Sequence, residues 1–504
     1  MSDASASLSS TFERFLAFEK GAGLFSREVC GVRFWHYIRF PVYSHLVLPY
    51  FVPTGHPHPD ALSRDGRKGV GKSRLARLKA KAKAFMSASR AFLFRNPVFT
   101  ARRREVFFSL VPRIARDSNG RRLRQMIDYF AGGLSHSWAV LERPVSGRGD
   151  CARHDGGGRI FEWREGRKAM SRFKSSREFA GMVPELADAA AALRGEIASE
   201  LGVRVEDGVL ERIVANALLC EHAAVPLLKK WFRRLGVRCV VSVVHYDYTN
   251  LAVAKAAHDM GVPVVELQHG TIYPAHAAYN LPVTDSPYSP DYLLGWGGHW
   301  LRQTRNFPAR KALAVGYPFL EKALADHPRA PHGGTPLVLF ISQGTIGKDL
   351  SALAAELAGR ARNAYRIVFK PHPTEVKSWR RLYPALAGSG VEVAEDAARG
   401  IYSWLAEADA VAGVYSTAMI EGFVWGVKAY VFRRLPGAET MEGFCSYGAA
   451  EYVDGAEDLD ARLRAQFASG ASGGAAVDRT DLFADNAAAN VSAAIDRIVE
   501  GEEP

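Results

Sequence analysis

Cysteine is scarce in this 504-residue sequence. The five cysteines lie far apart and never form a C-x-x-C pair; they are Cys30, Cys151, Cys220, Cys239 and Cys445. An odd number of widely spaced cysteines argues against a disulfide framework, and the missing C-x-x-C pairs argue against a zinc site. We therefore expect no bound metal and a reducing compartment, of which the cytoplasm is the simplest.

Signals for export and for crossing a membrane are also missing. Residues 1–10 lack the charged and then apolar pattern of a signal peptide. The most apolar stretch, 32–52, has about membrane-spanning length, but each charged side chain at the centre of a bilayer would cost about 2.5–3.5 kcal/mol. Four side chains interrupt this stretch, namely Arg33, His36, Arg39 and His45. We predict a buried or interfacial segment there.

Acidic residues are nearly absent from one part of the chain. The whole sequence has 65 Lys/Arg, 53 Asp/Glu and a formal net charge of +12. Between Arg64 and Arg104 there are fourteen Lys/Arg and a single acid, Asp65, so the rest of the chain is close to neutral. Apolar residues recur three and four positions apart from Leu75 to Phe92, which indicates a basic amphipathic helix.

Two interpretations fit this basic helix. It is either a solvated helix that packs on its own domain, or a contact with an anionic membrane surface, where each cation near the headgroups contributes about 1 kcal/mol. No recognisable nucleic-acid-binding module accompanies it, and the basic charge stays local. We therefore expect no nucleic acid partner.

From residue 104 onward, short apolar runs alternate with helical patterns, which is typical of a parallel α/β architecture. Strands are predicted at 106–110, 138–141, 239–244, 262–267, 292–296, 312–316, 337–341, 366–369, 410–414 and 427–432. Helices are predicted over much of 184–235 and at 249–260, 349–362, 376–386, 401–406, 416–425 and 485–498. A segment rich in Pro, His and Gly, 325–336, is the best linker candidate.

This pattern predicts an α/β fold of two Rossmann-like domains that face a cleft, preceded by a basic helical segment. The expected boundaries are 1–103 for the basic N-terminal segment, 104–325 for the first Rossmann-like domain, 337–480 for the second, and 481–504 for a C-terminal helix. Residues 66–73 fit the G-x-x-x-x-G-K-[ST] phosphate loop, but no apolar run precedes them, so we do not expect ATP to bind there.

The strongest local signal is Lys370-Pro371-His372-Pro373, which follows a predicted strand. Ligands of open α/β sheets bind beyond the carboxyl ends of the strands, and the two prolines restrict the backbone on either side of His372. We predict that Lys370 and His372 face a phosphate group. A turn with an exposed histidine is the alternative.

Other strand ends offer further polar groups. Ser416 and Thr417 begin a predicted helix, where free amides and hydroxyls favour an anion, and Glu421 lies one turn later. An ordinary helix cap is the alternative there. Ser342, Gln343, Gly344 and Thr345 occupy an equivalent strand-to-helix position.

Histidine also follows a strand in the first predicted domain. In Glu266-Leu267-Gln268-His269-Gly270-Thr271, His269 is placed to remove a proton from a substrate hydroxyl or to stabilise a leaving phosphate, and it is the leading catalytic candidate. His245 and Asp247 end the neighbouring strand; either is the base or orients His269. A buried histidine with a purely structural role is the alternative for His269.

Four motifs together resemble bacterial capsule and surface-polysaccharide transferases: Q-H-G-T at 268–271, G-Y-P at 316–318, K-P-H-P at 370–373 and S-T-x-x-x-E-G at 416–422. The sequence is similar to the family that includes Kdo transferases, and more distantly to polyol-phosphate polymerases and bacterial sialyltransferases. The resemblance covers roughly 237–432. It implies a GT-B fold, a donor that is mostly a cytidine nucleotide, phosphate contacts from His372, Ser416 and Thr417, and His269 at the reaction centre.

The predicted donor-binding residues are Lys370, His372, Pro373, Ser416, Thr417, Glu421, Ser342, Gln343, Gly344, Gly316 and Pro318. The predicted acceptor-side residues are Gln268, Gly270 and Thr271. No D-x-D element stands near the expected donor site, which fits metal-independent transfer without a cofactor.

We therefore expect an inverting glycosyltransferase of capsule or lipopolysaccharide synthesis, which transfers a CMP-activated sugar such as Kdo to a lipid-linked or glycan acceptor. Its expected place is the cytoplasm, at the inner face of the membrane. The alternatives are a CDP-polyol phosphotransferase, a UDP- or GDP-hexose transferase, and a non-catalytic assembly or export protein that retains the fold.

Overall fold

A computed structural model describes residues 7–51, 103–111, 114–116, 122–143, 159–307, 311–329, 334–396, 399–446, 448–469 and 478–504. The chain divides into two compact units. The N-terminal unit comprises Thr11–Val47, the described part of 57–318 and Phe483–Pro504, and the C-terminal unit is formed mainly by Phe319–Leu482. Nearly all of the predicted basic segment, 64–104, and the whole 66–73 pattern lie outside the described residues.

A parallel seven-stranded sheet forms the centre of the N-terminal unit, in the order β5-β4-β1-β6-β7-β8-β9. Its strands are β1 Val106–Ser109, β4 Trp138–Glu142, β5 Arg159–Glu162, β6 Cys239–Ser242, β7 Val264–Leu267, β8 Tyr292–Gly295 and β9 Lys311–Ala314. Every residue of β1, β4, β6 and β7 is buried. Helices cover both faces of such a sheet, which explains why these strands are continuous apolar runs in the sequence.

A second parallel sheet forms the centre of the C-terminal unit, in the order β12-β11-β10-β13-β14-β15. Its strands are β10 Leu337–Ile341, β11 Arg366–Lys370, β12 Glu392–Val393, β13 Ala410–Gly413, β14 Lys428–Phe432 and β15 Ala450–Val453. Both sheets are doubly wound: the strand order reverses next to β1 in one and next to β10 in the other. The predicted α/β fold with two Rossmann-like sheets, GT-B-like in kind, is confirmed.

The points of reversal decide where a ligand is expected. In the N-terminal unit the order reverses between β1 and β6, and in the C-terminal unit between β10 and β13. Ligands of doubly wound sheets bind outside the carboxyl ends of the strands at such points. The loops that follow β6, β10 and β13 lie at these points, and the loops that follow β7 and β11 lie next to them.

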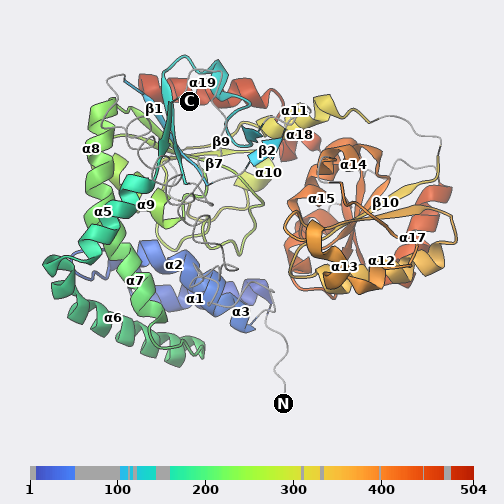
Figure 1. The fold of residues 1–504 in the computed structure, drawn as a ribbon, viewed down its shortest axis with the longest axis horizontal. Helices are drawn as coiled ribbons and strands as arrows, with labels where there is room; N and C mark the ends of the chain where they lie inside the picture. The colour runs from blue at the N-terminus through green and yellow to red at the C-terminus, as the bar shows by residue number, and fades with distance from the viewer. Residues whose placement is uncertain are drawn as a thin grey trace, which may run out of the picture. The chain divides into compact units, whose positions relative to one another are not determined.

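Helices surround the sheet of the N-terminal unit (Figure 1). They include α5 Arg164–Lys174, α6 Arg177–Leu201, α7 Val209–Leu219, α8 Val225–Leu235, α9 Tyr248–His258 and α19 Ala487–Glu500. Local chemistry sets their ends. The Ser176 side chain accepts a hydrogen bond from the Phe179 amide at the start of α6, and Gly202 ends that helix in the left-handed conformation that glycine adopts readily. Near the C-terminus, Ser492 of α19 donates to the Phe130 carbonyl (3.1 Å).

The N-terminal residues form α1 Leu8–Gly21, α2 Trp35–Val42, a π turn over Tyr43–Val47 and α3 Leu48–Phe51. The side chains of the predicted buried or interfacial segment are mainly buried, and Arg39 is accommodated by an ion pair with Glu19 (2.6 Å). Burial raises the pKa of Glu19, and the charge of Arg39 opposes that shift. Across the described ranges of the chain, no helix combines the length and the apolar character needed to cross a membrane.

Several elements differ from the sequence prediction. The helix expected at 376–386 is broken into the short turns Val376–Ser378, Trp379–Leu382 and Pro384–Leu386. Pro384 has no amide hydrogen to continue the preceding turn, which accounts for the last break. The helix expected at 416–425 is α15 Thr417–Glu421 followed by a 3-10 turn.

Candidate functional site

Strand β6 ends in a strained turn. Val244 has a φ of 64°, in the left-handed region that a β-branched residue rarely adopts and that costs about 1–3 kcal/mol. Its amide donates to Glu266 Oε1 (3.1 Å), and its carbonyl accepts from the Asn250 side chain (2.9 Å). These two contacts hold the backbone in a conformation that brings His245 and Tyr246 beside β7.

The carboxylate of Glu266, on β7, is the centre of a buried polar cluster. Its side chain is fully buried and accepts hydrogen bonds from Ser242 Oγ (2.8 Å) and Tyr279 Oη (3.2 Å). The Nδ1 atoms of His245 and His269 lie 3.5 and 3.4 Å from Oε1. Burial alone would raise the pKa of Glu266, but hydrogen bonds and charge from the two histidines lower it to about 2. The group is therefore a buried carboxylate.

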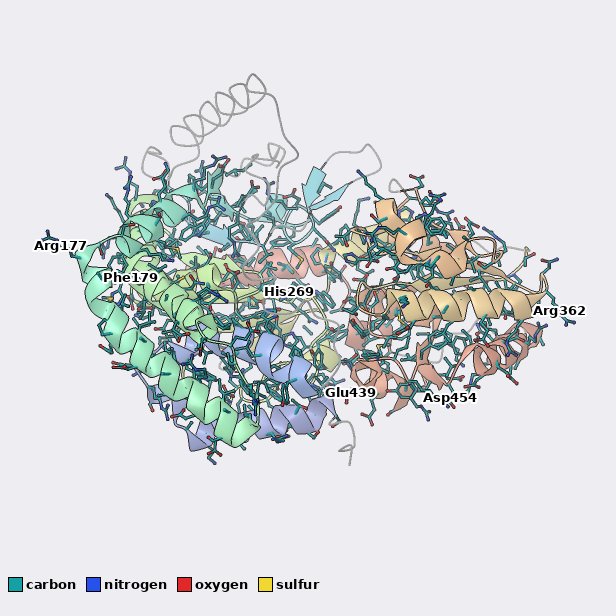
Figure 2. All side chains as sticks on the ribbon, turned by 60° about the horizontal axis from the view of Figure 1, so that its bottom comes forward. Arg177, Phe179, His269, Arg362, Glu439 and Asp454 are labelled. Carbon is teal, nitrogen blue, oxygen red and sulfur yellow. The ribbon has the colours of Figure 1, made fainter. Side chains whose placement is uncertain are left out.

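His269 follows β7 with its two ring nitrogens in different surroundings. Nδ1 faces Glu266, and Nε2 lies 3.2 Å from Tyr246 Oη. Nδ1 is hydrogen-bonded to the Tyr279 hydroxyl (3.4 Å), and because that hydroxyl gives its own hydrogen to Glu266, its oxygen accepts from Nδ1. Nδ1 therefore carries a proton, and Nε2 is the acceptor when the ring is neutral. This is the geometry of a general base oriented by a carboxylate. Figure 2 marks the position of His269 in the N-terminal unit.

Aromatic rings gather around His269. Tyr246 and Tyr279 contact its ring at centroid distances of 5.9 and 6.5 Å, and His276 packs against Tyr279 at 5.0 Å. Burial, together with the nearby His269 and His245, lowers the pKa of His276 to about 3, so its ring is neutral. Of these residues, Tyr246 and His276 are partly exposed, whereas Tyr279 is buried.

The predicted alternatives to His269 have other partners. Asp247 accepts from the Thr249 amide (2.9 Å), which caps α9, and it forms an ion pair with Arg143. His245 Nε2 lies 3.1 Å from the Ala278 carbonyl, so this nitrogen is occupied by a backbone contact, while Nδ1 lies 3.5 Å from Glu266 Oε1. The geometry thus favours His269 as the base, with His245 as a second histidine on the same carboxylate.

Two other predicted residues of the N-terminal unit, Gln268 and Gly316, have structural roles. Gln268 accepts from the Trp296 amide (2.7 Å) and donates to the Gly270 carbonyl (2.9 Å). Gly316 has a φ of 91°, and a Cβ there would overlap the Ala484 carbonyl. This close approach accounts for the glycine without a ligand. Thr271 is partly exposed beside the histidine, and Pro318 begins α11 Pro318–Asp326.

In the C-terminal unit, the loop after β10 lies at the point of reversal and leads into α12 Gly347–Ala361. A Cβ at Gly344 would lie 2.9 Å from Glu375 Oε1, and one at Gly347 would overlap the Tyr383 hydroxyl. The sequence S-x-G-x-x-G at 342–347 therefore places its glycines where the backbone is closely approached. The sequence prediction included Ser342, Gln343 and Gly344 but missed Gly347, whose spacing from Gly344 was the available signal.

Partners of this loop come from the neighbouring strands. The Thr345 hydroxyl is hydrogen-bonded to Tyr415, which follows β13. His372 is exposed; its Nδ1 lies 2.7 Å from Thr374 Oγ1, and its amide donates to Glu375 Oε2 (3.2 Å). Burial lowers the pKa of Lys370 at the end of β11.

Ser416 caps the short helix α15. Ser416 Oγ accepts from the Ala418 amide (3.3 Å), and Thr417 starts the one-turn helix α15. Such a short helix provides little macrodipole, so the hydroxyls are the main polar groups offered to a ligand. Glu421 is buried. This geometry is compatible with both a helix cap and a phosphate contact at Ser416 and Thr417, and with both an exposed turn and a phosphate contact at His372.

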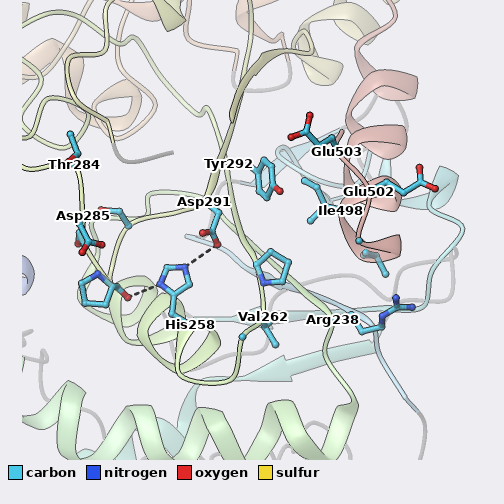
Figure 3. Close-up of a pocket in the computed structure, with 17 residues that line it drawn as sticks. Arg238, His258, Val262, Thr284, Asp285, Asp291, Tyr292, Ile498, Glu502 and Glu503 are labelled. Atoms are coloured by element: carbon cyan, nitrogen blue, oxygen red, sulfur yellow. Dashed lines mark hydrogen bonds and ion pairs between the residues drawn. The ribbon is translucent and has the colours of Figure 1, made fainter. Parts of the chain in front are cut away.

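A separate cavity of about 740 Å³ lies at the opposite edge of the N-terminal sheet (Figure 3). Arg238, Pro263 and Asp291, which line it, directly precede β6, β7 and β8. His258 bridges Asp291 Oδ2 (3.1 Å) and the Pro287 carbonyl (2.8 Å). The cavity contains none of the predicted site residues, and it lies at the amino ends of β6, β7 and β8, not at their carboxyl ends. Within the described parts of the chain, no cluster of three or more His, Cys, Asp or Glu could hold a metal ion.

The strain at Val244 gives a test of the turn. Val244→Gly should leave the free energy of unfolding unchanged or raise it by up to about 1 kcal/mol, because glycine adopts positive φ without steric cost. The matched control Val243→Gly, at a fully buried neighbour without positive φ, should lose about 2–4 kcal/mol. Urea unfolding measures both. Equal losses for the two variants would show that Val244 is not strained.

Comparison with known proteins finds a likeness of fold but no related sequence family. No family model matches the sequence, and no curated protein matches it. Among solved structures, it resembles MnaA of S. aureus with UDP (8% identity, TM-score 0.45, 79% of this chain and 99% of that chain). It also resembles UDP-GlcNAc 2-epimerase of Neisseria meningitidis bound to UDP-GlcNAc (10%, 0.43, 77% and 98%) and a glycosyltransferase of Rickettsia africae ESF-5 (13%, 0.39, 79% and 94%). These likenesses are too low to transfer a function.

Proposed function

We propose that this chain is a glycosyltransferase that uses a nucleotide-activated sugar, with His269 as its general base. The observation that carries the proposal is the buried Glu266 carboxylate, which faces Nδ1 of His269 and leaves Nε2 as a proton acceptor. The cluster lies at the carboxyl end of β7, where doubly wound sheets bind ligands. The strained turn at Val244 lies beside it, as such turns often do at functional sites.

In the proposed reaction, His269 Nε2 removes the proton from the acceptor hydroxyl as the hydroxyl oxygen attacks the anomeric carbon of the donor. The new carbon–oxygen bond forms with inversion while the bond to the nucleotide phosphate breaks, and the phosphate leaves with the bonding electrons. The proton ends on Nε2, and the Glu266 carboxylate stabilises the resulting imidazolium. In this step the acceptor hydroxyl takes the place of the Tyr246 hydroxyl, which is hydrogen-bonded to Nε2.

The C-terminal unit is the proposed donor-binding part. Its loop at 342–347 follows β10 at the point where the strand order reverses, and Lys370 supplies a cation at the next strand end. His372, Ser416, Thr417 and their resemblance to surface-polysaccharide transferases support a cytidine donor, with a CMP-linked sugar such as Kdo as the first choice.

The acceptor proposed on the same resemblance is a lipid-linked or surface glycan, and the place of action is the inner face of the cytoplasmic membrane. Incubation of the protein with cytidine donors and lipid-linked acceptors, followed by mass spectrometry of the products, tests this assignment. A product that carries one added sugar supports transfer, whereas a product that carries a polyol phosphate supports the CDP-polyol alternative.

Nucleotide binding is the direct test of the donor proposal. CMP or CDP at about ten times its Kd should stabilise the protein by about 1.4 kcal/mol, and UDP and GDP should stabilise it less. His372→Ala should abolish the shift, whereas the matched control His327→Ala, at the end of α11, should keep it. Thermal-shift titration measures these changes. Absence of stabilisation by all four nucleotides would support a non-catalytic protein instead.

A further inference from the structure

The helices α5 and α8 carry a dense excess of cations. Arg164–Lys174 and Val225–Leu235 contain nine Lys/Arg and a single acid, Glu165. Six of these cations are exposed and form no ion pair with any described residue; they are Arg167, Arg172, Lys174, Lys230, Arg233 and Arg234. Solvated helices usually interleave both signs of charge, so an excess of one sign indicates a partner of the opposite sign. We call the exposed side chains of these two helices the α5–α8 face.

The two helices pack against the same π turn, Cys220–Ala224, and two aromatic pairs place them near each other. Trp163 at the start of α5 contacts Trp231 of α8, with ring centroids 6.0 Å apart. Near the end of α5, Phe173 stacks on His222, which directly precedes α8, at 5.6 Å. These two contacts mean that the helices run in opposite directions, and Figure 1 shows both on the same side of the N-terminal unit.

The cationic surface continues beyond these helices. Arg177 follows α5 and projects into solvent from the first turn of α6 (Figure 2). At the other end, the amide of Arg104 donates to the Leu235 carbonyl (2.8 Å), and the Arg103 side chain lies beside Gly236. Arg103 and Arg104 thus add positive charge at the last turn of α8.

We propose that the α5–α8 face binds the surface of an anionic lipid bilayer. Cations from two adjacent helices are spread over an extended face, and each cation near anionic headgroups contributes favourably to binding. The aromatic side chains of the two helices are buried or, at Phe173, packed against Phe179 and His222, which leaves little ring surface for the base stacking that binds single-stranded nucleic acids. The binding rests on these charges and not on the proposed reaction.

The test uses the full chain and vesicles of two compositions, one of phosphatidylcholine alone and one containing about one third phosphatidylglycerol. The variant R167Q/R172Q/R233Q/R234Q should bind the anionic vesicles at least tenfold more weakly, because it removes four cations near the headgroups. The matched control K20Q/R33Q/R204Q/R362Q removes four exposed cations elsewhere and should lose less than threefold. Co-sedimentation at physiological salt and at 0.5 M salt measures binding, and thermal melting shows that both variants are folded.

Each other outcome overturns the proposal. Native affinity in the face variant would place all binding outside this surface. Equal losses in the face variant and its control would show that only the net charge matters. Equal binding to both vesicle compositions, or binding that does not weaken at 0.5 M salt, would exclude an electrostatic contact with lipid. Tighter binding to a 20-nucleotide single strand, lost in the face variant, would assign the surface to nucleic acid instead.

Discussion

Turnover should fall about 10²- to 10⁴-fold when His269 is replaced by alanine, which is the usual contribution of a general base. Nε2 of this ring is the proton acceptor that the Glu266 carboxylate orients, and no other histidine of the cluster offers an equivalent atom toward Tyr246. The kcat for sugar transfer measures the loss. Added imidazole should restore part of the activity, because the variant leaves space where the ring was.

The matched control is His136→Ala. His136 contacts Glu105 (3.4 Å) just before β4 begins, at the amino edge of the same sheet. Its loss should leave kcat within about twofold, because general base catalysis needs a group within hydrogen-bond reach of the substrate. If His269→Ala keeps its native turnover while its melting temperature is unchanged, His269 is a structural histidine and the proposed mechanism is wrong.

Replacement of Glu266 by glutamine should lower the free energy of unfolding by about 1–3 kcal/mol, since it removes the charged acceptor of hydrogen bonds from Ser242, Tyr279 and the Val244 amide. The pKa of Glu266 is lowered to about 2 from the ordinary value of 4.5. Its stabilising effect is therefore complete above about pH 4.5 and is lost as the pH falls toward 2. Urea unfolding from pH 7 to pH 3 should show the difference between native chain and variant shrinking below pH 4.5.

The same variant should also change the reaction. Without the carboxylate, His269 loses its proton more readily, so the acid limb of the pH–rate profile should move to lower pH while kcat falls. The control is Glu162→Gln, which removes another buried carboxylate, paired with the partly exposed Arg164 (2.6 Å), on β5 with three strands between it and β7. It should lose stability but keep the native pH profile. An unshifted acid limb in Glu266→Gln would mean that this carboxylate does not act through His269.

Most of the fold follows from the sequence because its strands are buried on both faces. Runs such as 337–341 have no polar positions, so the strand β10 has the predicted limits. Short strands at the edges of the two sheets could not be predicted from the sequence. The edge strand β5 begins next to a polar, glycine-rich stretch, and β12 is only two residues long, so neither has enough apolar residues to produce a pattern.

The candidate site was predictable in part. His269 was identified because a histidine follows a buried strand, whereas Glu266 was not assigned a role although it stands in the same motif. A charged residue in the middle of an apolar strand was the available signal, because buried carboxylates need partners. Tyr246 and Tyr279 had no such signal, since their approach to His269 depends on how two loops fold. Asp247 precedes a predicted helix, and that position indicates the cap that it makes.

The last helix, α19, has a consequence for how the protein is made. Ser492 of α19 bonds to Phe130, and Ala484 and Ala487 fill the space beside Gly316, so residues from the end of the chain complete the N-terminal unit. Domains usually fold in order as the ribosome releases them. Here the unit that is translated first cannot finish folding until α19 has left the ribosome. During that interval its partly formed surface is exposed to chaperones and proteases, and a truncation that removes α19 would leave Phe130 and Gly316 without their partners.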